Sequence, residues 1–111
     1  MNDVVDVTAI RQLNDQLRKS LSGGVLVMTA AVRALDEARQ VEVLNAVGAF
    51  DGFDADNDPY GEHDFGALEV TGKRILFKID YYDVALTSHS PDPADPSVTK
   101  RVLTIMLAEE Y

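Results

Sequence analysis

The sequence contains no cysteine, which excludes disulfides, thiolate metal ligands and thiol chemistry. It also lacks any apolar run long enough to cross a membrane. The first residues, MNDVVDVTAI, carry two aspartates and no basic residue, a pattern unlike that of a secretory signal. We therefore expect a cytoplasmic protein that makes no membrane contact.

Basic residues are scarce, with 10 Lys and Arg against 19 Asp and Glu, a net charge of −9 and a pI of about 4.4. The shortage is sharpest in residues 51–64 and 80–96, which together hold ten of the acidic residues and no Lys or Arg. Binding to nucleic acid through its phosphates requires clustered Lys and Arg. Direct contact with nucleic acid is therefore not expected, and a cation or a basic protein surface is the favoured partner.

The hydrophobic content of 46% and the length of 111 residues indicate a single folded domain over residues 1–111. A first helix is expected from a Thr8 cap to the Ser22–Gly24 stop, with Ile10, Leu13, Leu17 and Leu21 as its apolar stripe. The opposite side of this helix is predicted to hold the polar residues Arg11, Asn14, Asp15, Arg18 and Lys19.

Residues 25–29 are predicted to form a short strand buried on both faces, followed by a turn over residues 30–35. Asp36 is suited to cap a second helix. The apolar stripe expected for this helix consists of Ala38, Val41, Leu44, Val47 and Phe50.

A hairpin is predicted from residues 64–70 and 73–82, joined at Thr71 and Gly72. Thr71 is poorly suited to positive φ, so a two-residue turn and a turn with a glycine bulge both stay open. Either register brings Glu62, His63 and Asp64 beside the end of the second strand at Asp80. Residues 83–98 form a long connection, and β-branched residues favour a central strand rather than a helix over residues 102–108. In this strand we expect Leu103, Ile105 and Met106 to be buried.

These elements predict an α+β fold in the order α-β-α-β-β-β, with two helices packed on one face of a mostly antiparallel, roughly four-stranded sheet. The acidic segment 51–64 leads into the first hairpin strand, and the acidic segment 80–96 follows the end of the second. Because the two hairpin strands are antiparallel, both segments should meet at the same end of the sheet.

The segments NDPYGEHDFG, KIDYYD and RVLTIMLAEEY resemble a family of small uncharacterised proteins, a domain of unknown function found largely in alphaproteobacteria and often on plasmids or other mobile DNA. The resemblance extends from about Leu13 to Tyr111. It implies no catalytic residues, since none are established for the family. It does imply that a function shared by members of the family would involve three segments together, which are the acidic loop, the end of the KIDYYD strand and the C-terminal strand.

Alternating carboxylates at Asp54, Asp56 and Asp58 resemble the start of a calcium loop. An EF-hand requires Gly at the sixth position and an acid at the twelfth, where this chain has Pro59 and Phe65. The alternatives are a solvated turn in which Asp and Asn bond their own backbone, and a different divalent-cation site. The residues open to that cation site are Asp54, Asp56, Asp58, Glu62, Asp64 and Asp80.

His63 and His89 offer a second chemistry, an acid and base for phosphodiester cleavage with Lys78 holding the phosphate. The surrounding carboxylates would repel such a substrate unless a metal intervened. The competing interpretation is that His63 and Asp64 attach the acidic loop to the sheet. Zinc is disfavoured, because two histidines and no cysteine leave carboxylates to complete its coordination.

The hypothesis we prefer is a non-enzymatic binding module, an inhibitor or regulator that presents an acidic, tyrosine-bearing surface to a basic partner and imitates nucleic acid. No catalytic residue and no cofactor is assigned. The alternative is a metal-dependent enzyme or divalent-cation-binding protein using the same Asp, Glu and His residues. The predicted partner-binding residues are Asp54, Asp56, Asp58, Tyr60, Glu62, His63, Asp80, Tyr82 and Asp83.

Overall fold

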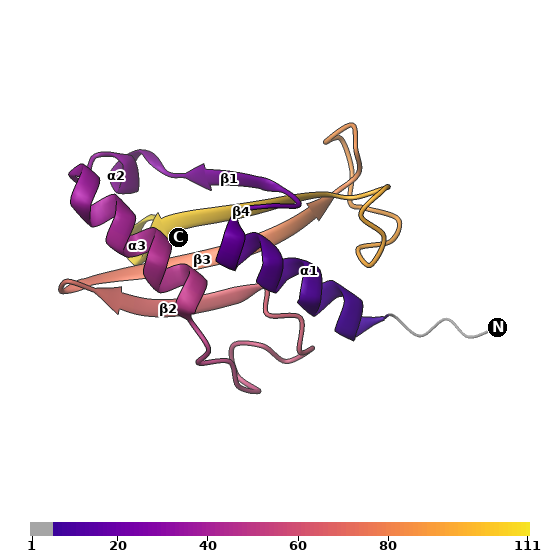
Figure 1. The fold of residues 1–111 in the computed structure, drawn as a ribbon, viewed down its shortest axis with the longest axis horizontal. Coiled ribbons are helices and arrows are strands. Elements are labelled where there is room, and N and C mark those ends of the chain that lie inside the picture. The colour runs from indigo at the N-terminus through magenta and orange to yellow at the C-terminus, as the bar shows by residue number, and fades with distance from the viewer. Residues whose placement is uncertain (1–5) are drawn as a thin grey trace.

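The computed structural model describes residues 6–111, which form two layers, with helices on one side of a four-stranded sheet (Figure 1). The elements follow the order α1 (Val7–Ser20), β1 (Val25–Met28), α2 (Ala30–Arg33), α3 (Glu37–Ala49), β2 (Phe65–Val70), β3 (Lys73–Tyr82), β4 (Lys100–Leu107) and the 3₁₀ turn η1 (Ala108–Glu110). The predicted α+β class is confirmed. Within the described part of the chain, no helix is long and apolar enough to cross a bilayer.

The sheet has the strand order β1-β4-β3-β2 and is mixed. β3 pairs antiparallel with both β2 and β4, whereas β1 pairs in parallel with β4. The prediction of a mostly antiparallel sheet therefore needs correction at β1. A parallel pair is formed by strands distant in sequence, so local hydrophobic patterns do not reveal it.

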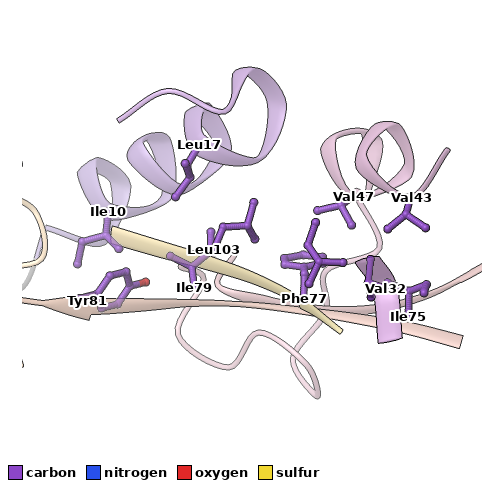
Figure 2. Close-up of a cluster of buried hydrophobic side chains, with 11 residues drawn as sticks. Ile10, Leu17, Val32, Val43, Val47, Ile75, Phe77, Ile79, Tyr81 and Leu103 are labelled. Carbon is purple, nitrogen blue, oxygen red and sulfur yellow. The ribbon is translucent and has the colours of Figure 1, made fainter. Parts of the chain in front are cut away.

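The core lies between the sheet and the helices α1 and α3. Figure 2 shows Ile75, Phe77, Ile79 and Tyr81 of β3 pointing toward these helices. These four residues alternate along β3 and therefore share the face that the helices cover. In β4, Leu103, Ile105 and Met106 are all buried, as expected for the central strand.

The hairpin between β2 and β3 contains a two-residue turn, one of the two alternatives that Thr71 had left open. Both Thr71 (φ 51°) and Gly72 (φ 78°) have positive φ, and Val70 pairs directly with Lys73. This conformation suits the twist of a two-residue hairpin, and an Oγ1 hydrogen bond to Glu42 Oε2 at 2.7 Å holds Thr71. The open register is thereby settled.

Helix boundaries differ from the predictions in two places. α1 begins at Val7 and is capped by Asp6, whose Oδ1 accepts a hydrogen bond from the Ala9 amide at 3.0 Å, rather than by Thr8. The region predicted as a turn contains the short helix α2, which packs beside β4. The Asp36 cap of α3 is confirmed, since its Oδ1 accepts from the Arg39 amide at 2.8 Å.

The predicted burial is wrong in part for three segments. In α3 the predicted Val47 does face the core, but Val43, which was outside the predicted stripe, faces it too, while Val41 is 52% exposed. β1 is an edge strand with exposed residues at alternate positions, so it is not buried on both faces. In α1, Asn14 and Arg18 lie in the buried stripe with Ile10 and Leu17.

Candidate functional site

The acidic loop, residues 51–64, begins with a turn held together by its own side chains. Asp54 Oδ1 accepts hydrogen bonds from the amides of Asp56 (2.9 Å) and Asn57 (3.0 Å). Asn57 Oδ1 accepts in return from the Asp54 amide at 3.0 Å. This matches the interpretation of a solvated turn that bonds its own backbone. Asp54 and Asp56 are exposed, and the nearby Tyr60 is 76% exposed.

Asp58 and His63 attach the loop to the rest of the fold. Asp58 is only 8% exposed, and its Oδ1 accepts from the His63 amide at 3.1 Å. The His63 ring stacks on Phe53, with centroids 3.9 Å apart, and its Nδ1 lies 2.8 Å from Asp15 Oδ1. His63 therefore anchors the loop to α1, not to the sheet, and Asp58 serves the loop rather than the outer surface.

Arg18 connects this cluster to the end of α3. Its Nη1 donates to the carbonyls of Val47 (2.8 Å) and Phe50 (2.9 Å), and its Nη2 donates to Asp15 Oδ1 at 2.8 Å. The guanidinium thus binds carbonyls at the C-terminal end of α3, which is the negative end of the helix dipole. Burial raises the pKa of Asp15, but the hydrogen bonds from Arg18 and His63 outweigh it, so this pKa lies below its ordinary value.

A second polar network joins α1, β3 and β4. Asn14 Nδ2 donates to Tyr81 Oη at 2.7 Å, and Tyr81 Oη donates to Glu62 Oε1 at 2.7 Å. Arg101 donates through Nε to Asn14 Oδ1 at 2.8 Å and through Nη2 to the Pro93 carbonyl, and its guanidinium lies over the Tyr81 ring. Burial, and then the bond to Glu62, raises the pKa of Tyr81. Tyr81 is therefore a neutral hydrogen-bonding residue inside the fold.

A hollow of about 300 Å³ opens where β2 begins and β3 ends; we call it the acidic hollow. Its lining contains Asp64, Ile79, Asp80, Tyr81, Tyr82 and His89. The first loop reaches it through Asp64, whose carbonyl accepts from the Ile79 amide at 2.8 Å. The second loop reaches it through His89, which pairs with Tyr82. The predicted meeting of the two loops is confirmed at this point, although in Figure 1 the remainder of each loop extends in a different direction.

The other predicted residues lie around this hollow with partners of their own. Asp80 Oδ2 is 3.1 Å from Lys78 Nζ, and Tyr82 is partly exposed. Asp83 Oδ1 accepts from the Thr87 amide at 2.9 Å, which shapes the start of the second loop. His63 lies at the same end of the sheet as Asp80, but its ring turns toward Asp15 on α1.

The residues considered for phosphodiester cleavage do not lie together in the structure. Lys78 alternates with the core residues Phe77 and Ile79, so it points away from the helices, whereas His63 contacts α1 on the helical side. Within residues 6–111, no group of three or more His, Asp and Glu side chains is arranged to hold a metal ion.

Substitution of Asp64 tests whether the clustered carboxylates of the acidic hollow destabilise the fold. Burial, and then the charges of Glu62, Asp58 and Asp80, raise its pKa above 3.8. The charged form therefore costs stability, and this cost grows as the pH rises from about 3.8 through the raised pKa. We expect Asp64→Asn to raise the melting temperature at pH 7.

The advantage of Asp64→Asn should disappear as the pH falls below the folded-state pKa of Asp64, because wild type is then neutral there too. Thermal melts of both proteins between about pH 3 and pH 7 measure this difference. A constant difference at every pH would contradict the titration and indicate a packing effect.

Sequence reasoning missed Asn14, Asp15, Arg18 and Arg101 as parts of the site. A signal was present for two of them, because Asn14 and Arg18 stand four and eight residues after Ile10 and so share its helical face. Because both side chains are polar, they were predicted to lie on the solvent-exposed side of the helix. Arg101 is a cation within the most hydrophobic strand, where a buried charge requires partners.

A model of a known protein family matches the greater part of the chain. The model described as "Protein of unknown function (DUF3768)" matches residues 28–110. The chain belongs to this family. The match begins later than the resemblance at Leu13, so α1, which supplies Asn14, Asp15 and Arg18 to the two polar networks, precedes the matched region of the DUF3768 chain. No curated protein and no solved structure matches the sequence.

Proposed function

We propose that this DUF3768 protein is a non-enzymatic binding module whose acidic hollow receives a basic side chain from a partner protein. The observation that carries the proposal is the lining of the hollow: two carboxylates, two tyrosines and a histidine, with no Lys or Arg in the lining itself. Two cations of the chain reach lining residues, Lys78 at Asp80 (3.1 Å) and Arg101 over the Tyr81 ring, so Asp64 and Tyr82 are the residues most open to a partner. Tyr82, which is 37% exposed, offers a ring beside these carboxylates, and a guanidinium can stack on a ring while it donates to an oxygen.

The charge around the hollow supports the same partner. Asp64 is half-buried among other carboxylates that raise its pKa, so a cation placed there would relieve their repulsion. The exposed carboxylates of Asp51, Asp54 and Asp56, together with the half-buried carboxylate of Asp83, extend the negative field over both loops. Such a field accelerates association with a basic surface.

The partner class follows from this chemistry. Basic protein surfaces commonly serve to bind nucleic acid, so an acidic module that occupies one would act as an inhibitor or regulator that imitates nucleic acid. A location on plasmids or other mobile DNA in alphaproteobacteria, as the resemblance implied, would fit such a role in the cytoplasm.

Binding of a fluorescent oligoarginine peptide tests the proposal. We expect Asp64→Asn combined with Asp80→Asn to weaken binding by about three- to tenfold, because both carboxylates line the hollow. Asp51→Asn with Asp56→Asn should mainly slow association and reduce its salt dependence, because both residues are exposed. Asp54 and Asp58 stay unchanged, since their carboxylates hold the loop.

The matched control is Glu37→Gln combined with Glu109→Gln, which removes two exposed charges outside the hollow. Titrations followed by fluorescence anisotropy, with stopped-flow association rates, compare the three double variants. If the control weakens binding as much as Asp64→Asn with Asp80→Asn, net charge alone attracts the peptide and the hollow is not the site.

A divalent cation in the same hollow is the alternative function, because Asp64 and Asp80 supply oxygen ligands there. A ligand that binds only the native state raises its melting temperature. The binding-module proposal expects Mg²⁺, Mn²⁺ and Ca²⁺ at millimolar concentration to act no more strongly than sodium chloride of equal ionic strength. A rise that Asp64→Asn with Asp80→Asn abolishes would instead favour the metal site.

A further inference from the structure

The acidic hollow lies at a break in the hydrogen-bonded ladder along one edge of β3. Where β2 begins, the Ile79 amide donates to the Asp64 carbonyl at 2.8 Å, and β3 then continues past this pair. Further along the same edge, the Tyr81 carbonyl accepts from the Ser90 amide at 3.0 Å, so the second loop takes the place that β2 has left. Figure 1 shows β3 extending beyond the start of β2 toward this loop. The hollow, which Asp64 and His89 line, lies between the two attachments.

The Tyr81 amide points into this break and has no acceptor among residues 6–111. The N–H and C=O groups of one strand residue project to the same edge, so this amide faces the side on which Ser90 binds the Tyr81 carbonyl. The equivalent amide of Ile79 donates to Asp64, but none of the described residues accepts from the amide of Tyr81. Tyr81 is only 9% exposed, and buried amides are almost always hydrogen-bonded. The break therefore leaves a donor that water or a bound molecule has to satisfy.

Both sides of the break are held in place. Ser90 is 4% exposed, and its Oγ lies 2.7 Å from Thr99 Oγ1 and accepts from the Asp92 amide at 3.1 Å. On the other side, the Asp64 carbonyl is already engaged with β3. The ladder is thus fixed on either side of the Tyr81 amide, which stays available between two anchored segments.

The charges around the break select the kind of acceptor. Asp64 and Asp80 line the hollow, and Glu62 lies close by, where its Oε1 accepts from Tyr81 Oη at 2.7 Å. These carboxylates would repel a carboxylate or a phosphate, so the acceptor that suits the Tyr81 amide is a neutral one beside a cation. A basic residue within a polypeptide offers both, because its side chain is the cation and a main-chain carbonyl is the neutral acceptor that strands use.

From this combination we infer that the partner inserts a basic residue on an extended main chain, with a carbonyl next to that residue accepting from the Tyr81 amide while the side chain binds Asp64. The inference rests on the function proposed above and adds main-chain recognition to it. In strand addition, main-chain hydrogen bonds supply affinity and side-chain contacts supply specificity. The hollow would therefore distinguish a basic residue of a polypeptide from a free cation of the same charge.

Two probes of equal charge separate these contributions. N-acetylarginine methylamide has a guanidinium beside peptide carbonyls, whereas butylguanidinium has the guanidinium alone. In titrations followed by amide chemical shifts of the isotope-labelled protein, the arginine derivative should bind about three- to tenfold more tightly, as one added hydrogen bond would give. N-acetylalanine methylamide has the same carbonyls without the charge and is the control, for which no binding is expected. Equal affinities for the two guanidinium compounds would overturn the inference.

Amide hydrogen exchange in the presence of oligoarginine gives a second readout. The Tyr81 amide should exchange several-fold more slowly at saturating peptide, because it gains an acceptor. The Ile79 amide is the matched control on the same strand edge, and it should change little because Asp64 already accepts from it. A Tyr81 amide that slows no more than the Ile79 amide would also overturn the inference.

These results separate the inference from the proposed function. Oligoarginine binding that depends on Asp64 and Asp80, without any change at the Tyr81 amide, would leave a cation site that ignores the main chain. Oligoarginine that does not bind at all would overturn both.

Discussion

Replacement of Arg18 by methionine is expected to lower the free energy of unfolding by about 3–5 kcal/mol, although methionine fills similar volume. Arg18 is 3% exposed and donates to the carbonyls of Val47 and Phe50 and to Asp15 Oδ1. Without it, the end of α3 keeps buried carbonyls that have lost this donor, and the Asp15 carboxylate loses its strongest cation. Each unsatisfied buried group costs about 1–3 kcal/mol.

Urea denaturation of Arg18→Met beside Arg39→Met measures this loss. Arg39 makes a similar ion pair with Glu42 at 3.1 Å, but its side chain is 46% exposed. Surface ion pairs contribute about 0–1 kcal/mol, so this control should change little. Arg18→Lys should fall between them, because a single ammonium cannot reach the α3 carbonyls and Asp15 in the forked geometry of a guanidinium. Equal losses for both methionine variants would show that the buried contacts add nothing.

The sheet was largely predictable because its signals are local. The residues of β3 lie within the predicted second hairpin strand, 73–82, and the β-branched residues of β4 indicated a central strand. The pairing of β2 with β3 follows from a two-residue turn. These features depend on residues close in sequence, where periodicity and turn chemistry act.

The burial of Ile10 and Leu17 on α1 was predicted correctly, whereas that of Asn14 and Arg18 was missed because their partners are distant in sequence. Asn14 bonds Tyr81, 67 residues away, and Arg18 bonds Val47, 29 residues away. A polarity scale assigns such side chains to solvent unless their partners are known. The edge position of β1 has the same cause, since it depends on a parallel pairing of Val25 with Val102.

The location of the candidate site was predictable from the sequence, but the roles of its individual residues were not. The hairpin brought Asp64 and Asp80 to one hollow, as expected from the register. The alternating aspartates looked equivalent in sequence, yet Asp56 is exposed while Asp58 is buried against His63. This difference arises from the stacking of His63 on Phe53, a contact that the sequence pattern does not specify.

Replacement of Phe77 by alanine should lower the free energy of unfolding by about 3–5 kcal/mol, because its ring is fully buried. The ring packs edge-on against Phe50 (centroids 5.5 Å apart) and Phe53 (6.3 Å). Phe53 in turn carries the stacked His63 ring. The loss should therefore also reach the acidic loop, where hydrogen exchange of the His63 amide, bonded to Asp58, should accelerate.

Gly66 provides a way to separate packing from general destabilisation. It pairs with Phe77 across the strands, and a Cβ added there would lie 2.7 Å from Phe77 Cζ and 2.8 Å from Phe50 Cε2. Gly66→Ala alone should therefore destabilise the fold by about 1–3 kcal/mol through overpacking. Introduced together with Phe77→Leu, which makes room at this position, the same change should cost about 1–2 kcal/mol less. Urea denaturation of the four proteins in this cycle measures the coupling. Strict additivity would mean that the Phe77 ring does not require glycine beneath it, and that another feature of β2 explains Gly66.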